Sequence, residues 1–270
     1  MTNLLNSKSA TALYNGQRIE TPPLTRAFCF GDGCFTTLRY QNNRFILLAQ
    51  HIQRLQRDCR ALKITAPDAA EIIRQLEHIQ PELAEQAILR ITVSRGMTQR
   101  GYQPDLQATP ELLIQWFAAQ PLKQQSIAGW LSDYRLSSQP ALAGIKHLNR
   151  LDQVMASAHT PVGKEAIMLD QQGYLVEGLS SNLFWRKGQK WFTPELTSCG
   201  VHGVAREWLI NQLDQQLNLI CALPEQLFSA DEVIVCNAAQ GIRKLESLND
   251  QALGTGTEYQ HLQHKLMDHK

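Results

Sequence analysis

The chain has 270 residues, of which 43% are hydrophobic and 19% charged, and its formal net charge is +1. This length accommodates two modest domains or one large one, and the composition excludes a disordered chain and a fibrous repeat. Lysine and arginine are spread along the sequence, so the field that attracts nucleic acid or an anionic membrane surface is missing. We therefore expect a globular protein with a small-molecule partner.

The N-terminal residues and the cysteine content indicate in which cellular compartment the protein is expected. The first residues lack a signal-peptide pattern and nowhere do eighteen apolar residues run together, so we expect a cytoplasmic protein without a membrane span. Six cysteines without a secretory signal are expected to be reduced thiols. Cys199 and His202 have no second ligand pair at matching spacing, so no metal site is predicted.

Two helices are predicted in the first half of the chain. One spans residues 50–62 after a strand at 44–48, and Arg54 lies off its apolar stripe. The stripe consists of Ile52, Leu55, Cys59 and Leu62. The second helix is predicted to begin near Asp68, a candidate N-cap, and to end at Pro81. Its inward-facing residues are Ile72, Leu76 and Ile79.

Two strands follow, at residues 87–96 and 111–118. In the first, Leu89, Ile91 and Val93 alternate with polar residues, which predicts a half-buried strand. The loop between the strands contains glycine and proline and carries Arg100. Loops of this length often lie over a functional site.

Residues 119–125 are short and polar, and we interpret them as a linker between an N-terminal domain (1–118) and a C-terminal domain (126–270). The C-terminal domain is predicted to contain a strand at 126–132, a helix at 147–159, strands between 165 and 193, a helix from 203 and a strand at 232–236. The whole pattern is that of an α+β or α/β protein.

Two charged residues stand in apolar surroundings. Lys146 lies in LAGIKHLNRL, where apolar flanks disfavour the charged ammonium and favour an amine nucleophile, although a lone lysine is more often a solvated surface group. Strand alternation places Glu177 on the same face as Leu175 and Leu179, where a carboxylate needs a partner. A protonated pyridine nitrogen is one such partner. A strand edge that faces water is the alternative for Glu177.

Two further segments could bind a phosphate or a substrate. The helix that opens with Gly203, Val204 and Ala205 offers accessible main-chain amides to a phosphate, although most helix starts bind nothing. Arg54 could supply a guanidinium to the same phosphate, with an ordinary surface arginine as the alternative. In FCFGDGCFTTLRY, the hydroxyl pair Thr36 and Thr37 either has a functional role or is selected for β-propensity.

Taken together and in this order, these segments resemble the fold-type IV pyridoxal phosphate enzymes. That family includes branched-chain aminotransferases, D-amino acid aminotransferases and aminodeoxychorismate lyases. The resemblance covers nearly the whole chain and rests on FGDGCFTT, HIQRL, ITVSRG with the following RGY, AGIKHLNRLDQV, LVEGLSSNLFW, GVHGVAR and DEVIVCNA. It implies two α/β domains with pyridoxal 5'-phosphate between them, and a homodimer whose partner contributes to each site.

The resemblance also implies roles for individual residues. Lys146 is similar to the lysine that holds the cofactor as a Schiff base, and Glu177 to the carboxylate on the pyridine nitrogen. Arg54 resembles the phosphate-binding arginine of the family's HxxRL motif. Main-chain amides at Val204, Ala205 and Ala238 are implied to assist it.

Within the family, GDGCFTT, AGIKHLNRL and the asparagine of CNA resemble the lyase branch, because the transaminases usually carry glutamate at the position of Thr36 and a small residue at that of Thr37. The implied substrate is 4-amino-4-deoxychorismate, which is cleaved to 4-aminobenzoate and pyruvate for folate. Thr37 is the expected proton relay, and Arg100, Asn237 and Thr36 are the expected substrate-binding residues.

Two alternatives stay open at this point. A D- or branched-chain amino acid aminotransferase would use the same lysine and cofactor, and the threonine pair argues against it. The segment CNAAQGIRKLESL also lacks the apolar-Pro-Val continuation often found there, which bears on the substrate more than on the cofactor. A non-catalytic binding protein on this scaffold would not need both Lys146 and Glu177.

Overall fold

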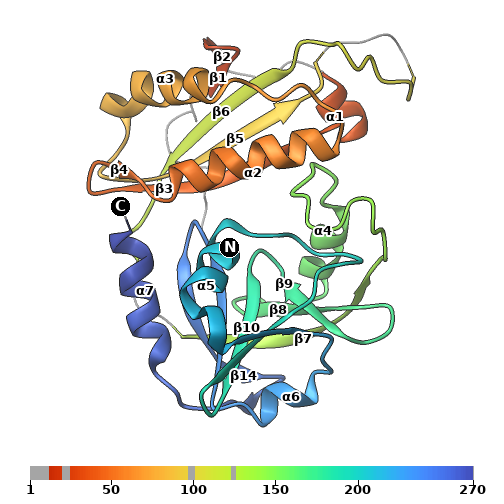
Figure 1. Cartoon of the computed structure of the whole chain (residues 1–270), viewed down its shortest axis with the longest axis vertical. Coiled ribbons are helices and arrows are strands. Elements are labelled where there is room, and N and C mark those ends of the chain that lie inside the picture. Colours follow the sequence, from red (N-terminus) through yellow and green to blue (C-terminus); the bar gives the residue numbers. More distant parts are fainter. Residues whose placement is uncertain (1–11, 20–24, 97–100, 123–125, 270) are drawn as a thin grey trace. The chain divides into compact units, whose positions relative to one another are not determined.

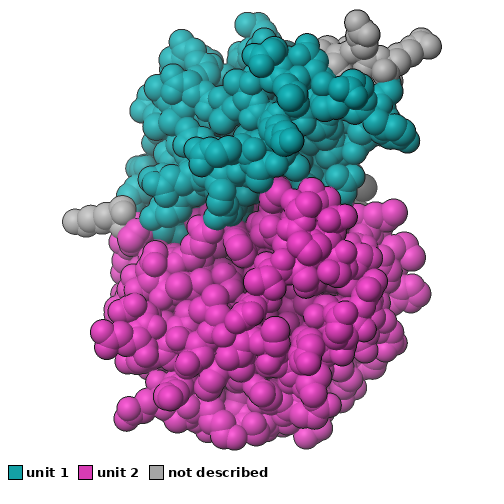
Figure 2. Space-filling view, turned by 45° about the vertical axis from the view of Figure 1, so that its right-hand side comes forward, with its two compact units in different colours: residues 1–121, 147–149 teal, residues 122–146, 150–270 magenta. Residues whose placement is uncertain are grey.

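The structure is a computed structural model that describes residues 12–19, 25–96, 101–122 and 126–269. The chain divides into two compact units, one of residues 1–121 and 147–149 and one of residues 122–146 and 150–270 (Figure 2). The division after Pro121 falls within the stretch interpreted as a linker. The assignment of residues 147–149 to the first unit was not expected from the sequence.

The first unit contains a six-stranded antiparallel sheet in the order β2-β1-β6-β5-β3-β4. Its strands are β1 (Ala12–Tyr14), β2 (Gln17–Ile19), β3 (Gly33–Gln41), β4 (Arg44–Phe45), β5 (Gln86–Ser94) and β6 (Glu111–Ala118). Its helices are α1 (Arg26–Phe30), α2 (Leu48–Ala61) and α3 (Ala69–Ile79), the last followed by the 3-10 turn η1 (Gln80–Glu82).

Helices α2 and α3 cover one face of this sheet (Figure 1), and the apolar core of the unit lies between them and the strands. Strand alternation directs Cys34 and Leu38 of β3 into this core, where they join Leu55 of α2. Thr36 shares the face of Cys34 and Leu38, whereas Thr37 points to the opposite face of the sheet.

The two predicted helices of this unit are confirmed, and α2 begins at Leu48, two residues before its predicted start. Asp68 caps α3 by accepting the main-chain N–H of Ala70 at 3.1 Å, as predicted. The predicted inward residues Ile72, Leu76 and Ile79 are fully buried. The strand expected at 44–48 spans only two residues, because Leu47 adopts a left-handed conformation (φ 55°) that turns the chain into α2.

The second unit contains a nine-stranded mixed sheet in the order β12-β11-β10-β13-β14-β7-β8-β9, with β15 paired to β14. Its strands are β7 (Ser126–Leu136), β8 (Glu165–Asp170), β9 (Leu175–Gly178), β10 (Asn182–Lys187), β11 (Lys190–Pro194), β12 (Leu217–Ile220), β13 (Glu232–Asn237), β14 (Gly241–Leu248) and β15 (Gln251–Ala252). Its helices are α4 (Leu151–Ala158), α5 (Val204–Leu213), α6 (Glu225–Phe228) and α7 (Glu258–Asp268), with the 3-10 turn η2 (Asp214–Gln216) after α5.

The helix predicted at 147–159 is wrong at its start, because α4 begins only at Leu151. Residues 147–149 are not helical, and they hydrogen bond to the segment where β3 begins. His147 forms an antiparallel bridge with Cys34, and the N–H of Leu148 donates to Gly33 O at 3.0 Å. These main-chain bonds replace the ones that a helix would have made.

Within the part of the chain that the structure describes, no helix is long and apolar enough to cross a membrane. All six cysteines are free thiols.

Candidate active site

Lys146 follows a tight crossing of two main-chain segments in the second unit. Gly144 forms a parallel bridge with Val201, its N–H donates to Gly200 O at 2.9 Å, and His202 N–H donates back to Gly144 O at 3.0 Å. Gly144 has φ +80°, and a β-carbon there would stand 2.8 Å from the His202 ring, so glycine is required. This crossing holds the backbone two residues before the half-buried Lys146.

Glu177 is buried on β9, with 5% of the residue exposed, so the alternative in which it faces water is wrong. Its Oε2 accepts the main-chain N–H of Val201 at 2.9 Å and an N–H of the Asn182 amide at 3.4 Å. The same amide nitrogen donates to Val201 O at 2.9 Å. Among the described residues, none donates a hydrogen bond to Oε1 of Glu177.

The electrostatic environment of Glu177 keeps its carboxyl near the point of ionisation. Burial raises its pKa to about 7, and the N–H of Val201 and the positive charges of Arg150, Lys146 and Arg206 oppose this rise. A cation that reached the open oxygen would favour the carboxylate further. The site therefore suits a ligand that brings a positive charge to Oε1.

Helix α5 begins shortly after Val201, whose N–H donates to the Glu177 carboxylate. Gly203 is its N-cap and carries no side-chain acceptor, and the main-chain amides of Val204 and Ala205 have no acceptor among the residues described. A side chain at Gly203 would collide with Oδ1 of Asn182. The start of a ten-residue helix with open amides is a favourable place for an anionic group such as a phosphate.

Asn237 shapes the turn that follows β13. Its Oδ1 accepts the N–H groups of Ala239 at 3.0 Å and Gln240 at 2.7 Å, and its amide donates to Ser180 O at 3.2 Å. An amide nitrogen has two protons, so one remains for a ligand. Ala238 lies in this turn and is buried. The binding roles expected for Asn237 and Ala238 stay predictions.

In the first unit, Thr36 lies between two side chains of α2. Its Oγ1 is 2.6 Å from Nδ1 of His51 and accepts a hydrogen bond from the Arg54 guanidinium. All three residues are buried, so the interpretation of Arg54 as a surface arginine is wrong. The Thr36 hydroxyl is fully enclosed, which favours a role in orienting Arg54 over the expected contact with substrate.

Sequence reasoning assigned no role to His51. It precedes Arg54 by three residues, and this spacing places both side chains on the same face of a helix. The sequence HIQRL contains this spacing, which could have indicated a shared role for His51 and Arg54. The apolar stripe of the same helix consists of other residues, and the prediction followed that stripe. The structure explains why His51 and Arg54 face the sheet, because both side chains contact the hydroxyl of Thr36 there.

Thr37 lies on the other face of β3 and is half-buried. Its partner across the strand pair is Arg90 of β5, whose guanidinium stacks 4.1 Å from the ring centroid of Phe35. Burial lowers the pKa of Arg90. A hydroxyl beside a half-buried guanidinium is a suitable place for proton transfer near an anion. Arg100, the other expected substrate ligand, lies outside the described residues.

Comparisons with known proteins agree with this arrangement. The model of the family Amino-transferase class IV matches residues 33–248. Aminodeoxychorismate lyase of Vibrio harveyi is 31% identical over 233 residues, which are 83% of this chain and 86% of that protein. D-alanine aminotransferase of Bacillus licheniformis is 26% identical and covers 90% of each chain.

Among solved structures, 4-amino-4-deoxychorismate lyase from Pseudomonas aeruginosa superposes with a TM-score of 0.85 at 32% identity, over 96% of this chain and 98% of that one. The Escherichia coli branched-chain amino acid aminotransferase has a TM-score of 0.84 at 21% identity, over 96% and 94%, and shows the same fold. The match spans most of the chain in every comparison, and this protein therefore belongs to the class IV aminotransferase family.

Proposed function

We propose that this protein is a pyridoxal 5'-phosphate-dependent lyase that converts 4-amino-4-deoxychorismate to 4-aminobenzoate and pyruvate, a step towards folate. The relatives named as lyases are 31% and 29% identical, and the relative named as a D-alanine aminotransferase is 26% identical. The threonine pair Thr36 and Thr37 supports the same choice.

The observation that carries the cofactor assignment is the buried Glu177. Its Oε2 is held by Val201 and Asn182 while Oε1 has no donor among the described residues, which fits the protonated ring nitrogen of the cofactor. The open amides of Val204 and Ala205 fit its phosphate. We further propose that Arg54, oriented by Thr36, and the amide of Ala238 bind the same phosphate, and that Lys146 forms the covalent link.

When bound, the cofactor supplies a cationic ring that withdraws electrons from the substrate carbon bearing the amine. Glu177 favours that cationic form, because an ionised carboxylate next to the ring nitrogen stabilises its proton. Nζ of Lys146 acts as the base that removes the proton from this carbon. Its position is set by the crossing of Gly144 with Val201.

The loss of this proton is coupled to cleavage of the carbon–oxygen bond that joins the ring to the enolpyruvyl group. The electron pair left on the ring makes it aromatic, and the departing enol takes up a proton and becomes pyruvate. We propose that Thr37 Oγ1 relays this proton. Because aromatisation makes the reaction strongly favourable, the residues are needed mainly to position the leaving group and to move protons.

The substrate carries two carboxylates and needs donors for them. We propose Arg100 and the free amide proton of Asn237 for this role. Replacement of Arg100 by alanine is expected to raise KM or lower kcat/KM while the cofactor absorbance stays intact, and unchanged kinetics would remove Arg100 from the site.

We also propose a cytoplasmic homodimer. Helix α4 exposes Leu151 by 70% and Val154 by 59%, and an exposed apolar helix face of this kind is commonly covered by a protein partner. Sedimentation equilibrium of the purified protein tests the dimer, and a monomer at micromolar concentration would contradict it.

The reaction is tested by incubating the purified protein with enzymatically generated 4-amino-4-deoxychorismate and measuring 4-aminobenzoate and pyruvate. Both products in equal amounts would support the lyase. Formation of a keto acid and of the pyridoxamine form of the cofactor from an added amino acid, without either product, would instead identify an aminotransferase.

A further inference from the structure

A buried ion pair in the second unit contacts the short connection, residues 179–181, that joins β9 to β10. Glu165, the first residue of β8, is 6% exposed, and its Oε2 accepts a hydrogen bond from the Arg243 guanidinium of β14 at 2.9 Å. Its Oε1 accepts the hydroxyl of Ser181, which is also buried, at 2.7 Å. Both oxygens of Glu165 therefore have donors, which a buried carboxylate requires.

Ser181 is the residue through which this ion pair reaches the connection. Its carbonyl oxygen accepts the main-chain N–H of Gly178 at 2.7 Å, so the two ends of the connection are bonded to each other. A β-carbon at Gly178 would stand 2.2 Å from Ser181 Oγ and 2.7 Å from Glu165 Oε1. The two side chains thus pack directly against the backbone of the residue that follows Glu177.

The residue after Ser181 supports the carboxylate of the candidate site. One amide nitrogen of Asn182 donates to Glu177 Oε2 at 3.4 Å and to Val201 O at 2.9 Å. Val201 in turn donates its N–H to the same Oε2 at 2.9 Å. Because Ser181 and Asn182 are adjacent, a hydrogen bond that holds the first fixes the backbone from which the second extends.

We propose that Glu165 is a positioning residue for Glu177. By holding Ser181 it fixes the connection at both ends, so that Oε2 of Glu177 stays on its donors and Oε1 stays open. The inference rests on the proposed function, in which this open oxygen faces the cationic ring nitrogen of the cofactor. A carboxylate that is already in place loses less conformational freedom when the cofactor binds.

The first test compares Ser181→Ala with Ser94→Ala. Ser94 is a matched control, because it is also buried and its hydroxyl also donates to a buried carboxylate, that of Glu111, at 2.8 Å. Ser181→Ala is expected to raise the dissociation constant of pyridoxal 5'-phosphate about tenfold, the equivalent of one hydrogen bond to a charged group. Ser94→Ala is expected to leave it unchanged. Equal dissociation constants for the two variants would overturn the proposal.

The pKa of Glu177 gives a readout that does not depend on the cofactor. Burial raises this pKa to about 7, and the N–H of Val201 opposes the rise. The cations that also oppose it are Arg150, Lys146 and Arg206. In Ser181→Ala the donors to the carboxylate are no longer held in place, so the pKa is expected to rise further, and in Ser94→Ala it is expected to stay the same.

Carbon-13 NMR of the apoprotein measures this pKa, with the Glu177 signal identified by its loss in Glu177→Gln. A general loss of stability in Ser181→Ala does not by itself move the pKa of one carboxyl. A less stable Ser181→Ala protein with an unchanged Glu177 pKa would therefore show that Ser181 serves folding alone, and would overturn the proposal.

A second comparison tests the cation of the ion pair. Arg243→Gln is expected to raise the dissociation constant of the cofactor, because Glu165 is then held in its orientation by one partner only. Arg186→Gln is the matched control, because Arg186 of β10 forms an ion pair with the fully buried Glu232 at 3.5 Å, and it is expected to leave cofactor affinity unchanged. If Arg243→Gln does not fold, Arg243→Lys keeps the charge without the fork of donors, and a smaller rise is expected. Unchanged affinity in the folded Arg243 variant would overturn the role of the pair.

The two readouts separate this inference from the proposed function. An unaltered protein that forms neither 4-aminobenzoate nor pyruvate, with a raised Glu177 pKa in Ser181→Ala, would reject the proposed function and leave the positioning of Glu177 standing. Both products from the unaltered protein, with the same pKa and cofactor affinity in Ser181→Ala, would overturn the positioning role and leave the proposed function standing.

Discussion

The main-chain N–H of Val201 donates to Oε2 of Glu177 at 2.9 Å, and the same residue is bridged to Gly144, two residues before Lys146. One backbone segment therefore supports both the carboxylate and the approach to the lysine. Because these supports are main-chain groups, they depend on the path of the chain more than on the identity of the side chain at Val201. The arrangement explains the glycines at this crossing. A side chain at Gly144 would collide with His202, and one at Gly203 would collide with Asn182.

Replacement of Lys146 by alanine is expected to abolish the visible absorbance of the purified protein and the label that borohydride fixes on the chain. The reason is that no other lysine should form the covalent link to the cofactor. The matched control is Lys164→Ala, which removes a lysine of the same unit that pairs with Asp250. Peptide mapping after reduction checks the result, and a label that persists in Lys146→Ala would refute the assignment.

The apoprotein is expected to lose stability as the pH rises through the range in which Glu177 ionises. Burial raises the pKa of Glu177 from its ordinary value of 4.5 to about 7, so between these values the folded state binds the proton more tightly than the unfolded state. The free energy of unfolding therefore falls as the pH rises through this window. The loss is about 3 kcal/mol.

Glu177→Gln removes this titration, because an amide does not ionise. Urea unfolding of both apoproteins at about pH 5 and about pH 8 checks the effect, and the variant is expected to lose less stability between the two values. The same pH dependence in both proteins would show that Glu177 is not the group responsible.

Substitutions of two adjacent threonines test the roles of the two faces of β3 separately. Thr36→Val removes the hydroxyl that contacts Arg54 and His51, and a lost hydrogen bond to a charged group costs about 1.5–3 kcal/mol, so cofactor affinity is expected to fall about tenfold or more. Thr37→Val alters the opposite face and is expected to lower kcat with little change in cofactor affinity. Equilibrium dialysis of the cofactor and steady-state kinetics measure the two effects, and equal cofactor affinities would contradict the assignment of Thr36.

Asp68→Ala is expected to destabilise the first unit by about 1 kcal/mol without a change in kcat/KM, because the side chain caps α3 and belongs to no proposed site. Thermal unfolding and the lyase assay measure the two quantities. A loss of activity in the folded variant would show that α3 has a role beyond packing.

The sequence by itself determined the elements whose periodicity is set by a buried face. The stripe of Ile72, Leu76 and Ile79 predicted α3, and the alternation of Leu89, Ile91 and Val93 predicted β5, because burial of one face imposes a helical or strand period on the apolar residues. The same alternation placed Glu177 on an apolar face but left a water-facing strand edge open, and the structure shows that the residue is buried. The family resemblance then supplied the cofactor and the lysine.

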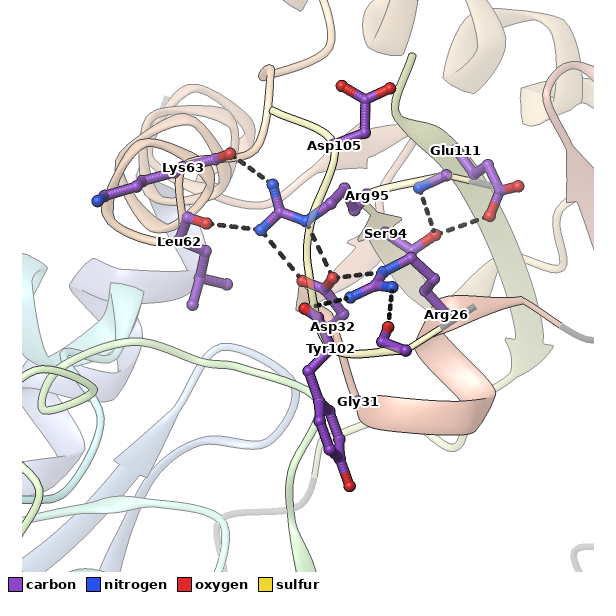
Figure 3. Close-up of polar contacts among 12 residues, drawn as sticks. Arg26, Gly31, Asp32, Leu62, Lys63, Ser94, Arg95, Tyr102, Asp105 and Glu111 are labelled. Atoms are coloured by element: carbon purple, nitrogen blue, oxygen red, sulfur yellow. Dashed lines mark hydrogen bonds and ion pairs between the residues drawn. The ribbon is translucent and has the colours of Figure 1, made fainter. Parts of the chain in front are cut away.

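Only the tertiary structure decided how polar groups are paired. Nothing local in the sequence shows that the carbonyl of Gly33 binds residue 148 in place of a helix start, or that His51 and Arg54 meet a hydroxyl from β3. Asp32 joins arginines that stand 6 and 63 positions away from it in the chain (Figure 3). Buried hydrogen-bonding groups must find partners wherever the fold brings them, so their pairing follows from distant contacts that a local period does not encode.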